Sequence, residues 1–588
     1  MKSFFKMALA SMVGIIVSFF ILLIVMILIV GVIISSAEDE KVRVYSNSVL
    51  HMPLNHPIIE RGTKGPFDNI DIGGIGASRS MGLNDILISI NNAKSDDKIK
   101  GIYLDLTNIQ AGLATSEEIR NALLDFKKSR KFILAYSEVY TKDSYYLASV
   151  ADKVYLNPEG ILEFTGFSSE LMFFKGALEK LEIEPQVIKV GTYKSAVEPF
   201  ILDKMSEANR QQVTSFLGSM YDHYLQRISA SRNVPKDSLF SIANQLKVKT
   251  AADAFTYKLV DGLRYKDQIL DELKSRTGTD KDKDVKSVTL ASYIKNNERE
   301  DGDFDTRIAV VYASGDINSG EGDDESIGSE RISRAIRKAR TDEKVKAVVL
   351  RVNSPGGSAL ASDVIWREVV LTKKVKPVIV SMGDLAASGG YYISCAADSI
   401  FAQPNTITGS IGVFGIIPNM QKFFNNKLGI TFDRVKTGEY ADLGSVARPL
   451  TETERLVIQK EVNRIYNSFT KRVAEGRKKT QQYVDEIGQG RVWSGSEALK
   501  IGLVDKLGDF DDAIRSAATM AKIKDYRIVS YPIQKDPLDA FFDKSGDDIR
   551  EYFAKQELGD QYQYYQKVKA ALRFKGVQAR MPFDVVVR

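Results

Sequence analysis

Cysteine and histidine are scarce in this sequence, and their scarcity excludes several kinds of chemistry. A single cysteine, Cys395, rules out an intrachain disulfide and any cysteine-rich metal site. Three histidines among 588 residues leave little room for a zinc enzyme or for a histidine-based triad. If the chain is a catalyst, its base is expected to be another residue type, and no metal or other cofactor is predicted.

An excess of charge of one sign is also lacking. The chain has 81 Lys and Arg against 76 Asp and Glu, which gives a formal net charge of +5. No clustered basic arm with interleaved aromatic residues occurs, so nucleic acid is not expected as a partner. With 44% hydrophobic and 27% charged residues the composition is typical of globular proteins, and the length indicates about three or four domain-sized units.

The first forty residues contain a long apolar run. No charged residue occurs from Met7 to Ala37, which is long enough to span a bilayer of about 30 Å. Lysines precede the run and Glu38, Asp39 and Glu40 follow it, so the positive-inside rule places residues 1–6 in the cytoplasm and the rest of the chain outside. A single-pass transmembrane anchor over 7–37 is therefore expected. Cleavage after Ser35-Ser36-Ala37 is the alternative, although a signal peptide has a shorter apolar region of about 7–15 residues.

The remainder of the chain is duplicated. An offset of 246 residues places Gly82 on Gly328, and it also aligns the segment Tyr145–Asp152 with the segment Tyr391–Asp398. A fixed offset of this length indicates two homologous domains rather than a short solenoid repeat. The boundaries expected are 45–295 for the first copy and 300–535 for the second, with a C-terminal tail over 536–588.

Each copy has the pattern of an alternating α/β fold. In the second copy, short apolar runs at 307–312, 347–352 and 377–381 predict buried strands. Helical periodicity covers 329–341 and recurs near 362–372. Apolar, non-alternating strands that alternate with helices predict parallel strands packed under helices.

Two motifs in the second copy each follow a predicted strand. Asn353-Ser-Pro-Gly-Gly-Ser358 contains two glycines that let backbone N–H groups approach a ligand, as in an oxyanion hole; a plain turn is the alternative. In Gly383-Asp-Leu-Ala-Ala-Ser-Gly-Gly390, small neighbours leave the Ser388 hydroxyl accessible at the start of a helix. A helix N-cap is the alternative reading of Ser388.

Comparison of the copies separates these alternatives. The first copy has lost both glycines and the serine, with Gln110, Ala111 and Lys142 at the positions of Gly356, Gly357 and Ser388. A turn or cap tolerates other residues, but lysine cannot replace a serine nucleophile. The motif Gly191-Thr-Tyr-Lys-Ser195 shows the opposite pattern: the first copy has Lys194 and the second copy has Ala441 at the matching position. Each copy therefore holds half of a candidate site, and Lys194 could act as a base if burial lowers its pKa.

Taken together, the apolar N-terminal run, the tandem repeat, these motifs and Thr408-Gly-Ser-Ile-Gly412 resemble the signal peptide peptidase A family in its long, two-domain (protease IV) form. The resemblance implies tandem ClpP/crotonase-like α/β domains after one transmembrane helix. It implies a serine endopeptidase in the bacterial inner membrane, with catalytic domains on the periplasmic side, that degrades signal peptides and other apolar peptides as a homotetramer.

The resemblance also implies roles for individual residues. Ser388 matches the nucleophile, Lys194 the general base and Ser410 a hydroxyl that orients the lysine. The oxyanion and substrate-binding positions are Gly356, Gly357 and Gly389. Two other functions remain open: a crotonase-like acyl-CoA enzyme with the same two-glycine loop, and a non-catalytic membrane scaffold.

Overall fold

The computed structural model describes residues 44–62, 80–296, 305–534 and 577–581, together with residues 4, 6, 7, 10–22, 24, 25, 557, 559 and 562. Residues 10–22 are helical. Within the described residues no helix has both the length and the apolarity needed to cross a membrane. Most of the C-terminal half of the run expected to form an anchor, over 7–37, lies outside the described residues.

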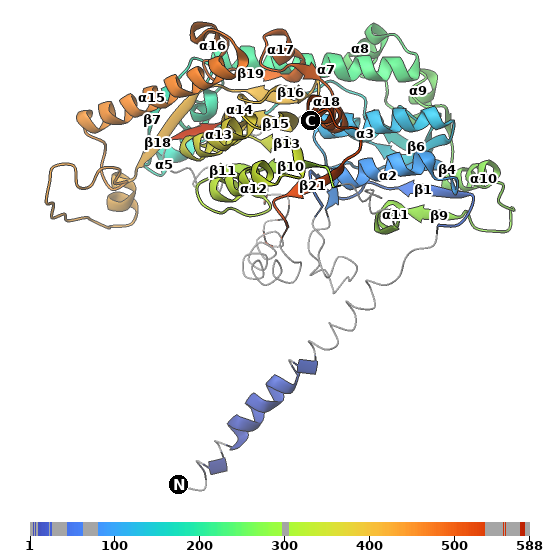
Figure 1. Ribbon diagram of the computed structural model, residues 1–588, viewed down its shortest axis with the longest axis horizontal. Coiled ribbons are helices and arrows are strands. Elements are labelled where there is room, and N and C mark those ends of the chain that lie inside the picture. The colour runs from blue at the N-terminus through green and yellow to red at the C-terminus, as the bar shows by residue number, and fades with distance from the viewer. Residues whose placement is uncertain are drawn as a thin grey trace.

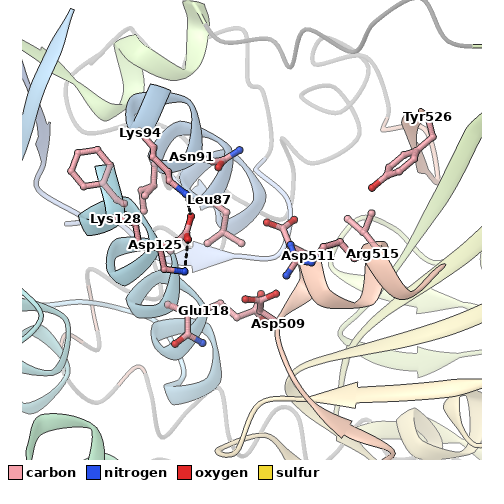
Figure 2. A pocket seen from close by; sticks show the side chains of 15 residues that line it. Leu87, Asn91, Lys94, Glu118, Asp125, Lys128, Asp509, Asp511, Arg515 and Tyr526 are labelled. Carbon is pink, nitrogen blue, oxygen red and sulfur yellow. Dashed lines mark hydrogen bonds and ion pairs between the residues drawn. The ribbon is translucent and has the colours of Figure 1, made fainter. Parts of the chain in front are cut away.

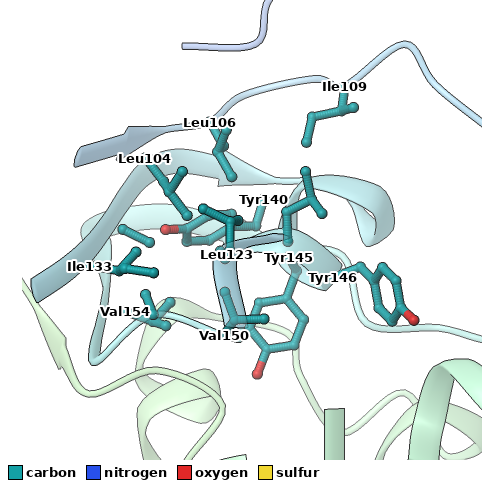
Figure 3. Packing of buried hydrophobic residues seen from close by; sticks show 14 of the residues in the cluster. Leu104, Leu106, Ile109, Leu123, Ile133, Tyr140, Tyr145, Tyr146, Val150 and Val154 are labelled. Carbon is teal, nitrogen blue, oxygen red and sulfur yellow. The ribbon is translucent and has the colours of Figure 1, made fainter. Parts of the chain in front are cut away.

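The first copy is built on a six-stranded parallel sheet with the order β8-β6-β5-β4-β1-β9. Its strands are β1 (Ser48–Met52), β4 (Ile99–Asp105), β5 (Phe132–Tyr140), β6 (Lys153–Leu162), β8 (Gly262–Leu263) and β9 (Ser287–Thr289). The helices that accompany it are α2 (Leu83–Ser95), α3 (Leu113–Phe126), α4 (Lys142–Ala148), α8 (Lys236–Asn244), α9 (Ala251–Thr256), α10 (Lys266–Thr277) and α11 (Leu290–Asn296). Figure 3 shows side chains of strands and helices, among them Leu104, Ile133 and Leu123, meeting in the core of this copy.

The second copy repeats this order of strands in a second sheet. The path β20-β16-β15-β13-β10-β21 is parallel throughout and matches the first sheet strand for strand. Its strands are β10 (Arg307–Ser314), β13 (Val345–Ser354), β15 (Val378–Ala387), β16 (Ser399–Ala402), β20 (Lys506–Leu507) and β21 (Arg527–Tyr531). The prediction of parallel, buried strands is confirmed, and two further strands extend the sheet beyond β15: β17 (Ile407–Gly409) and β19 (Val492–Ser494).

The helices of the second copy follow the predicted periodicity. Helix α12 spans Ser329–Thr341 as expected, and it buries Ile332, Ala335, Ile336 and Ala339, the spacing of one helical face. The helix expected near 362–372 is longer, α13 (Ala359–Lys373), because Ser358 accepts the backbone N–H of Ala361 and so begins the helix earlier. The other helices are α14 (Gly389–Ser394), α15 (Glu452–Arg477), α16 (Gln481–Ile487), α17 (Gly495–Lys500) and α18 (Phe510–Met520).

A third sheet combines strands from distant parts of the chain, in the order β12-β11-β14-β22-β18-β7. Four strands come from the second copy: β11 (Asp316–Asn318), β12 (Ser326–Gly328), β14 (Gly356–Ser358) and β18 (Val413–Asn419). Strand β7 (Glu184–Val190) comes from the first copy and β22 (Gln578–Arg580) from the C-terminal tail. Figure 1 shows β7 beside β18, far from the remaining strands of the first copy.

Polar contacts hold the two copies against each other. The guanidinium of Arg351 in β13 donates to Glu60 (Nε to Oε2, 2.7 Å) and to Glu118 in α3 (Nη2 to Oε1, 2.8 Å), and all three side chains are buried. Helix α7 (Glu207–Arg232) spans the junction, since Ser219 contacts Ser494 of the second copy while Tyr224 donates to the carbonyl oxygen of Lys142 in the first. The remaining short helices are α5 (Lys175–Lys180) and α6 (Glu198–Ile201), and a short strand pair consists of β2 (Ile58–Ile59) and β3 (Met81–Gly82).

Candidate active site

Ser388 lies at the sharp turn between β15 and α14. Its backbone has φ 55° and ψ −112°, a conformation that non-glycine residues seldom adopt and that strained functional turns often contain. The backbone N–H of Ser388 donates to the carbonyl oxygen of Gly409 at 2.8 Å, which fixes the turn against β17. Although Ser388 occupies the N-cap position, its side chain makes no capping hydrogen bond, so the interpretation of this hydroxyl as a helix cap is wrong.

Lys194 reaches the second copy because the strand before it pairs there. Strand β7 is antiparallel to β18, with Val190 opposite Val413, and the chain then turns towards β15. At the turn the backbones approach closely: a Cβ on Gly490 would lie 2.6 Å from the backbone nitrogen of Lys194. The sequence therefore uses glycine where this segment of the first copy crosses over the second.

Gln212 of α7 fixes the segment that carries Lys194. Its Nε2 donates to Ser195 Oγ at 2.9 Å and to the carbonyl oxygen of Tyr193 at 3.1 Å, and its Oε1 accepts the backbone N–H of Val492 at 3.1 Å. The side chain is fully buried. The sequence analysis did not identify Gln212, because it belongs to no motif and only the folded chain brings it between two segments.

The side chains of Lys194 and Ser388 meet in the interior. Lys194 Nζ lies 3.1 Å from Ser388 Oγ and 3.0 Å from Ser410 Oγ, and it also contacts the carbonyl oxygens of Ser410, at 3.4 Å, and of Arg580. Lys194, Ser388 and Ser410 are all buried. Burial lowers the pKa of Lys194 well below its ordinary value, because the charged ammonium loses its hydration.

Ser410 and Gly412 both lie against the side chain of Lys194. Ser410 has φ 49°, and its N–H donates to the carbonyl oxygen of Arg491 at 2.7 Å, which directs both its hydroxyl and its carbonyl to Lys194. A Cβ on Gly412 would lie 3.0 Å from Lys194 Cδ, so this position has room for glycine but little for a side chain. Within the motif Thr408–Gly412, Ser410 therefore contacts the lysine through its hydroxyl, and Gly412 leaves room for the lysine because it has no side chain.

The three predicted glycines gather beside Ser388. Gly356 and Gly357 have φ 99° and φ 155°, and a Cβ on Gly357 would lie 2.1 Å from the carbonyl oxygen of Ile317, so neither position accommodates another residue without strain. A Cβ on Gly356 would lie 2.7 Å from the backbone nitrogen of Gly389. Gly389 begins α14, where backbone N–H groups have no acceptor inside the helix. The loop thus brings backbone donors close to the Ser388 turn.

The corresponding positions of the two copies differ in structure as well as in sequence. Lys142, at the position of Ser388, directs its Nζ to the carbonyl oxygen of Gly166 at 3.1 Å and to Glu163 at 3.5 Å. Ala441, at the position of Lys194, is exposed in a turn. The fold therefore brings together Lys194 of the first copy and Ser388 of the second, and not Lys142 and Ala441.

A cavity of about 550 Å³ lies between the copies (Figure 2). Its walls come from α2, α3 and the start of α18, and they carry paired charges such as Lys94 with Asp125, and the carboxylates of Asp509 and Asp511. Burial raises the pKa of Asp509 to about 6. The cavity shares no lining residue with the Ser388 site.

A buried serine beside a buried lysine, in a duplicated α/β fold, is the arrangement expected of a serine hydrolase that works without histidine. Two segments, 125–280 and 371–524, match the family model "Peptidase family S49", one in each copy. The chain belongs to this peptidase family and is a serine protease. Family membership selects this function over the acyl-CoA enzyme and the scaffold.

Individual relatives agree with the family. "Protease 4" of Salmonella typhi is 39% identical over 477 residues, which cover 80% of this chain and 76% of the relative. "Serine protease SPPA, chloroplastic" of Arabidopsis thaliana is 34% identical over 493 residues, 82% of this chain and 70% of the relative. "Putative signal peptide peptidase SppA" of Enterococcus faecium is 35% identical over 243 residues, 40% of this chain and 70% of the relative. The first two similarities extend across both copies.

Proposed function

We propose that Ser388 is the nucleophile and Lys194 the general base of a Ser/Lys dyad, and that each chain forms this dyad from its own two copies. The observation that carries the proposal is the 3.1 Å separation of Lys194 Nζ and Ser388 Oγ in a buried site. That distance permits direct proton transfer. The lowered pKa of Lys194 favours the neutral amine, which is the form able to accept the proton.

The reaction follows from this geometry. Neutral Lys194 takes the proton of Ser388 as Oγ adds to the carbonyl carbon of a peptide bond, and the carbonyl oxygen becomes an oxyanion. The backbone N–H groups of Gly357 and Gly389 stabilise the oxyanion, and Gly356 lets them approach. The ammonium of Lys194 then protonates the leaving amine. Water attacks the acyl-enzyme as Lys194 accepts a proton from it, and return of that proton to Ser388 Oγ releases the acid.

We propose that Ser410 orients the lysine. The neutral amine has two N–H groups and one lone pair, and the lone pair must face Ser388 for proton transfer. Ser410 offers Lys194 two acceptors, its hydroxyl and its carbonyl oxygen. Donation of N–H groups to these acceptors turns the lone pair towards the nucleophile.

We propose signal peptides and other apolar peptides as substrates. The printed name of the Enterococcus faecium relative supports this, and so does an apolar cluster that includes Ala387, next to Ser388. Apolar side chains of a substrate would be stabilised there by loss of contact with water. Nucleic acid is not among the proposed partners.

We also propose the organisation that the sequence predicts: a cytoplasmic segment 1–6, a transmembrane anchor 7–37, domains 45–295 and 300–535 with the ClpP/crotonase-like fold, and a tail 536–588. This places the dyad on the periplasmic side of a bacterial inner membrane, in a homotetramer. The uncharged run that lysines precede and acidic residues follow supports the anchor and its orientation. The family resemblance supports the tetramer.

Hydrolysis of a fluorogenic peptide tests the dyad. Ser388→Ala and Lys194→Ala should each lower kcat/KM by at least about 10³-fold, because the loss of one member of a catalytic unit disables the whole unit. Lys142→Ala is the matched control, since it removes the lysine that stands at the position of Ser388 in the first copy, and it should keep wild-type activity. Full hydrolysis by either dyad variant would refute the assignment.

A further inference from the structure

Helix α3 of the first copy begins without a capping side chain of its own. Its N-cap position is Gly112, which has no side-chain acceptor, and no acidic residue occurs in its first turn. The backbone N–H groups at the start of a helix have no acceptor inside the helix, and Ala114 and Thr115, which carry two of these groups, are buried. A buried N–H group without a partner is destabilising, so an acceptor has to come from elsewhere in the fold.

That acceptor is Asp384 of β15, which belongs to the other copy. Its Oδ1 accepts the N–H of Ala114 at 2.9 Å and the N–H of Thr115 at 3.0 Å, and its Oδ2 accepts the hydroxyl of Thr115 at 2.5 Å. The fit is close, because a Cβ on Gly112 would lie 2.2 Å from the carboxylate carbon of Asp384. Three hydrogen bonds thus join the start of α3 to a single side chain of the second copy.

The second copy caps its own matching helix in a different way. Helix α13 has Ser358 at the position of Gly112, and the Ser358 side chain accepts the N–H of Ala361 within the same helix. The first copy has Glu138 at the position of Asp384, and Glu138 is exposed. Capping a helix at this position therefore requires only a local serine, and the carboxylate of Asp384 adds a link between the copies.

Asp384 lies four residues before Ser388, in a stretch of β15 that is hydrogen-bonded to its neighbours. The pairing of β13 with β15 shifts register between Val352 and Ser354, and bulges of this kind redirect side chains. Beyond the bulge, β15 pairs with β17 as far as Ala387, which directly precedes Ser388. A short paired strand therefore connects the position of Asp384 to the Ser388 turn.

The other end of the link leads to Lys194. Leu113, the first residue of α3, shares an apolar cluster with Phe216 of α7 and with Ala387. Helix α7 also carries Gln212, which holds the segment on either side of Lys194 through two hydrogen bonds. The link from β15 to α3 therefore joins the elements that carry the lysine to the strand that precedes the serine.

We propose that Asp384 is a positioning residue, which sets the placement of Ser388 relative to Lys194 by linking β15 to α3 across the two copies. The inference rests on the proposed dyad, whose two side chains come from different copies. Their 3.1 Å separation leaves little tolerance for proton transfer. A displacement of about 1 Å at such a site can reduce the rate about 10²-fold. The effect is expected in kcat, since the placement of the nucleophile governs the chemical step.

The first test is Asp384→Ala in the full chain, which should lower kcat for a fluorogenic peptide about 10- to 100-fold and change KM by less than about threefold. Asp384→Asn is the conservative variant, because its amide oxygen can still accept from Ala114 and Thr115, and it should keep kcat within about threefold of wild type. Glu138→Ala is the matched control at the exposed position of the first copy and should leave both constants unchanged. Wild-type kcat in Asp384→Ala, or the same loss in Asp384→Asn as in Asp384→Ala, would overturn the proposal.

A double variant separates positioning from helix capping. Asp384→Ala/Gly112→Ser gives α3 a serine cap of its own, as Ser358 gives α13, while the link between the copies stays broken. Gly112 has φ −74° and ψ 166°, which suit a serine N-cap, and the three atoms nearest to its added Cβ all belong to the Asp384 side chain that the first change removes. The urea midpoint should therefore return towards the wild-type value, whereas kcat should stay low. Wild-type kcat in the double variant would show that Asp384 is only a helix cap and would overturn the inference.

Ser388→Ala distinguishes failure of this inference from failure of the dyad. Hydrolysis by Ser388→Ala at the wild-type rate would refute the dyad, and this inference with it. An inactive Ser388→Ala, measured beside a double variant with wild-type kcat, would refute the role of Asp384 alone.

Discussion

Ser410→Ala measures how much the orientation of Lys194 contributes to the reaction. The change removes the hydroxyl that lies 3.0 Å from Lys194 Nζ and keeps the Ser410 carbonyl oxygen at 3.4 Å. The amine stays buried beside Ser388, so the proposed dyad remains. The variant should therefore be a slower enzyme rather than an inactive one.

The size of the effect follows from the loss of one hydrogen bond. A typical intramolecular hydrogen bond contributes about 0.5–1.5 kcal/mol net, and about 1.4 kcal/mol of barrier corresponds to a tenfold change in rate. If the bond from Lys194 to Ser410 is fully expressed in the transition state, kcat/KM should fall about two- to thirteen-fold. The assay is hydrolysis of a fluorogenic peptide, with kcat/KM measured across pH so that a shift in the pKa of the lysine is separated from a loss of rate.

Ser410→Gly is the informative companion. The residue has φ 49°, where glycine is unstrained and alanine is not, so this variant removes the same hydroxyl and also relieves the backbone. The two variants should have the same kcat/KM, while the glycine variant should be the more stable by about 1 kcal/mol. Wild-type activity in both would show that the hydroxyl orients nothing, and a loss above about 10³-fold would place Ser410 in the chemistry itself.

Two further predictions concern buried charge. Lys194→Met should abolish hydrolysis yet raise the free energy of unfolding at neutral pH, because the folded-state pKa of the lysine lies below its unfolded-state value. The gain in free energy of unfolding should be full below the folded-state pKa and should shrink as pH rises to the ordinary pKa of lysine. A gain that does not depend on pH in urea unfolding would contradict this. Arg351→Met should lower the free energy of unfolding by about 3–5 kcal/mol, since Glu60 and Glu118 lose their buried cation. The control is Arg464→Met, at an exposed pair with Glu461, which should change the free energy of unfolding by less than about 1 kcal/mol. Similar urea midpoints for the two variants would contradict this.

Much of the fold could be predicted from the sequence, because the two copies in one chain can be compared with each other. The offset between the copies anticipated two sheets with one strand order, and helical periodicity located α12 to the residue. The same comparison singled out Lys194 and Ser388, which the structure places 3.1 Å apart. The small residues around Ser388, and the absence of serine or lysine at the matching position of the other copy, are visible in the sequence without knowledge of the fold.

Long-range pairing could not be read in the same way. Nothing in the composition of β7 indicates that it pairs with β18 of the other copy, and nothing in the three residues of β22 indicates a partner. Strand pairing depends on neighbours and burial more than on intrinsic preference, so short strands that join distant segments have no signature of their own. Gln212 escaped notice for a related reason, because three of its hydrogen bonds link segments that only the folded chain brings together.

The crossing of β7 explains why the duplicated chain brings a lysine and a serine together once. The first copy extends β7 onto the second, and the turn that follows delivers Lys194 to Ser388. In the second copy the corresponding residue, Ala441, lies exposed in a turn. Because Ala441 has no amine, the second copy offers no lysine at this position to activate a serine. The first copy has Lys142, Gln110 and Ala111 where the second copy has Ser388, Gly356 and Gly357, so it lacks both the hydroxyl and the two-glycine loop.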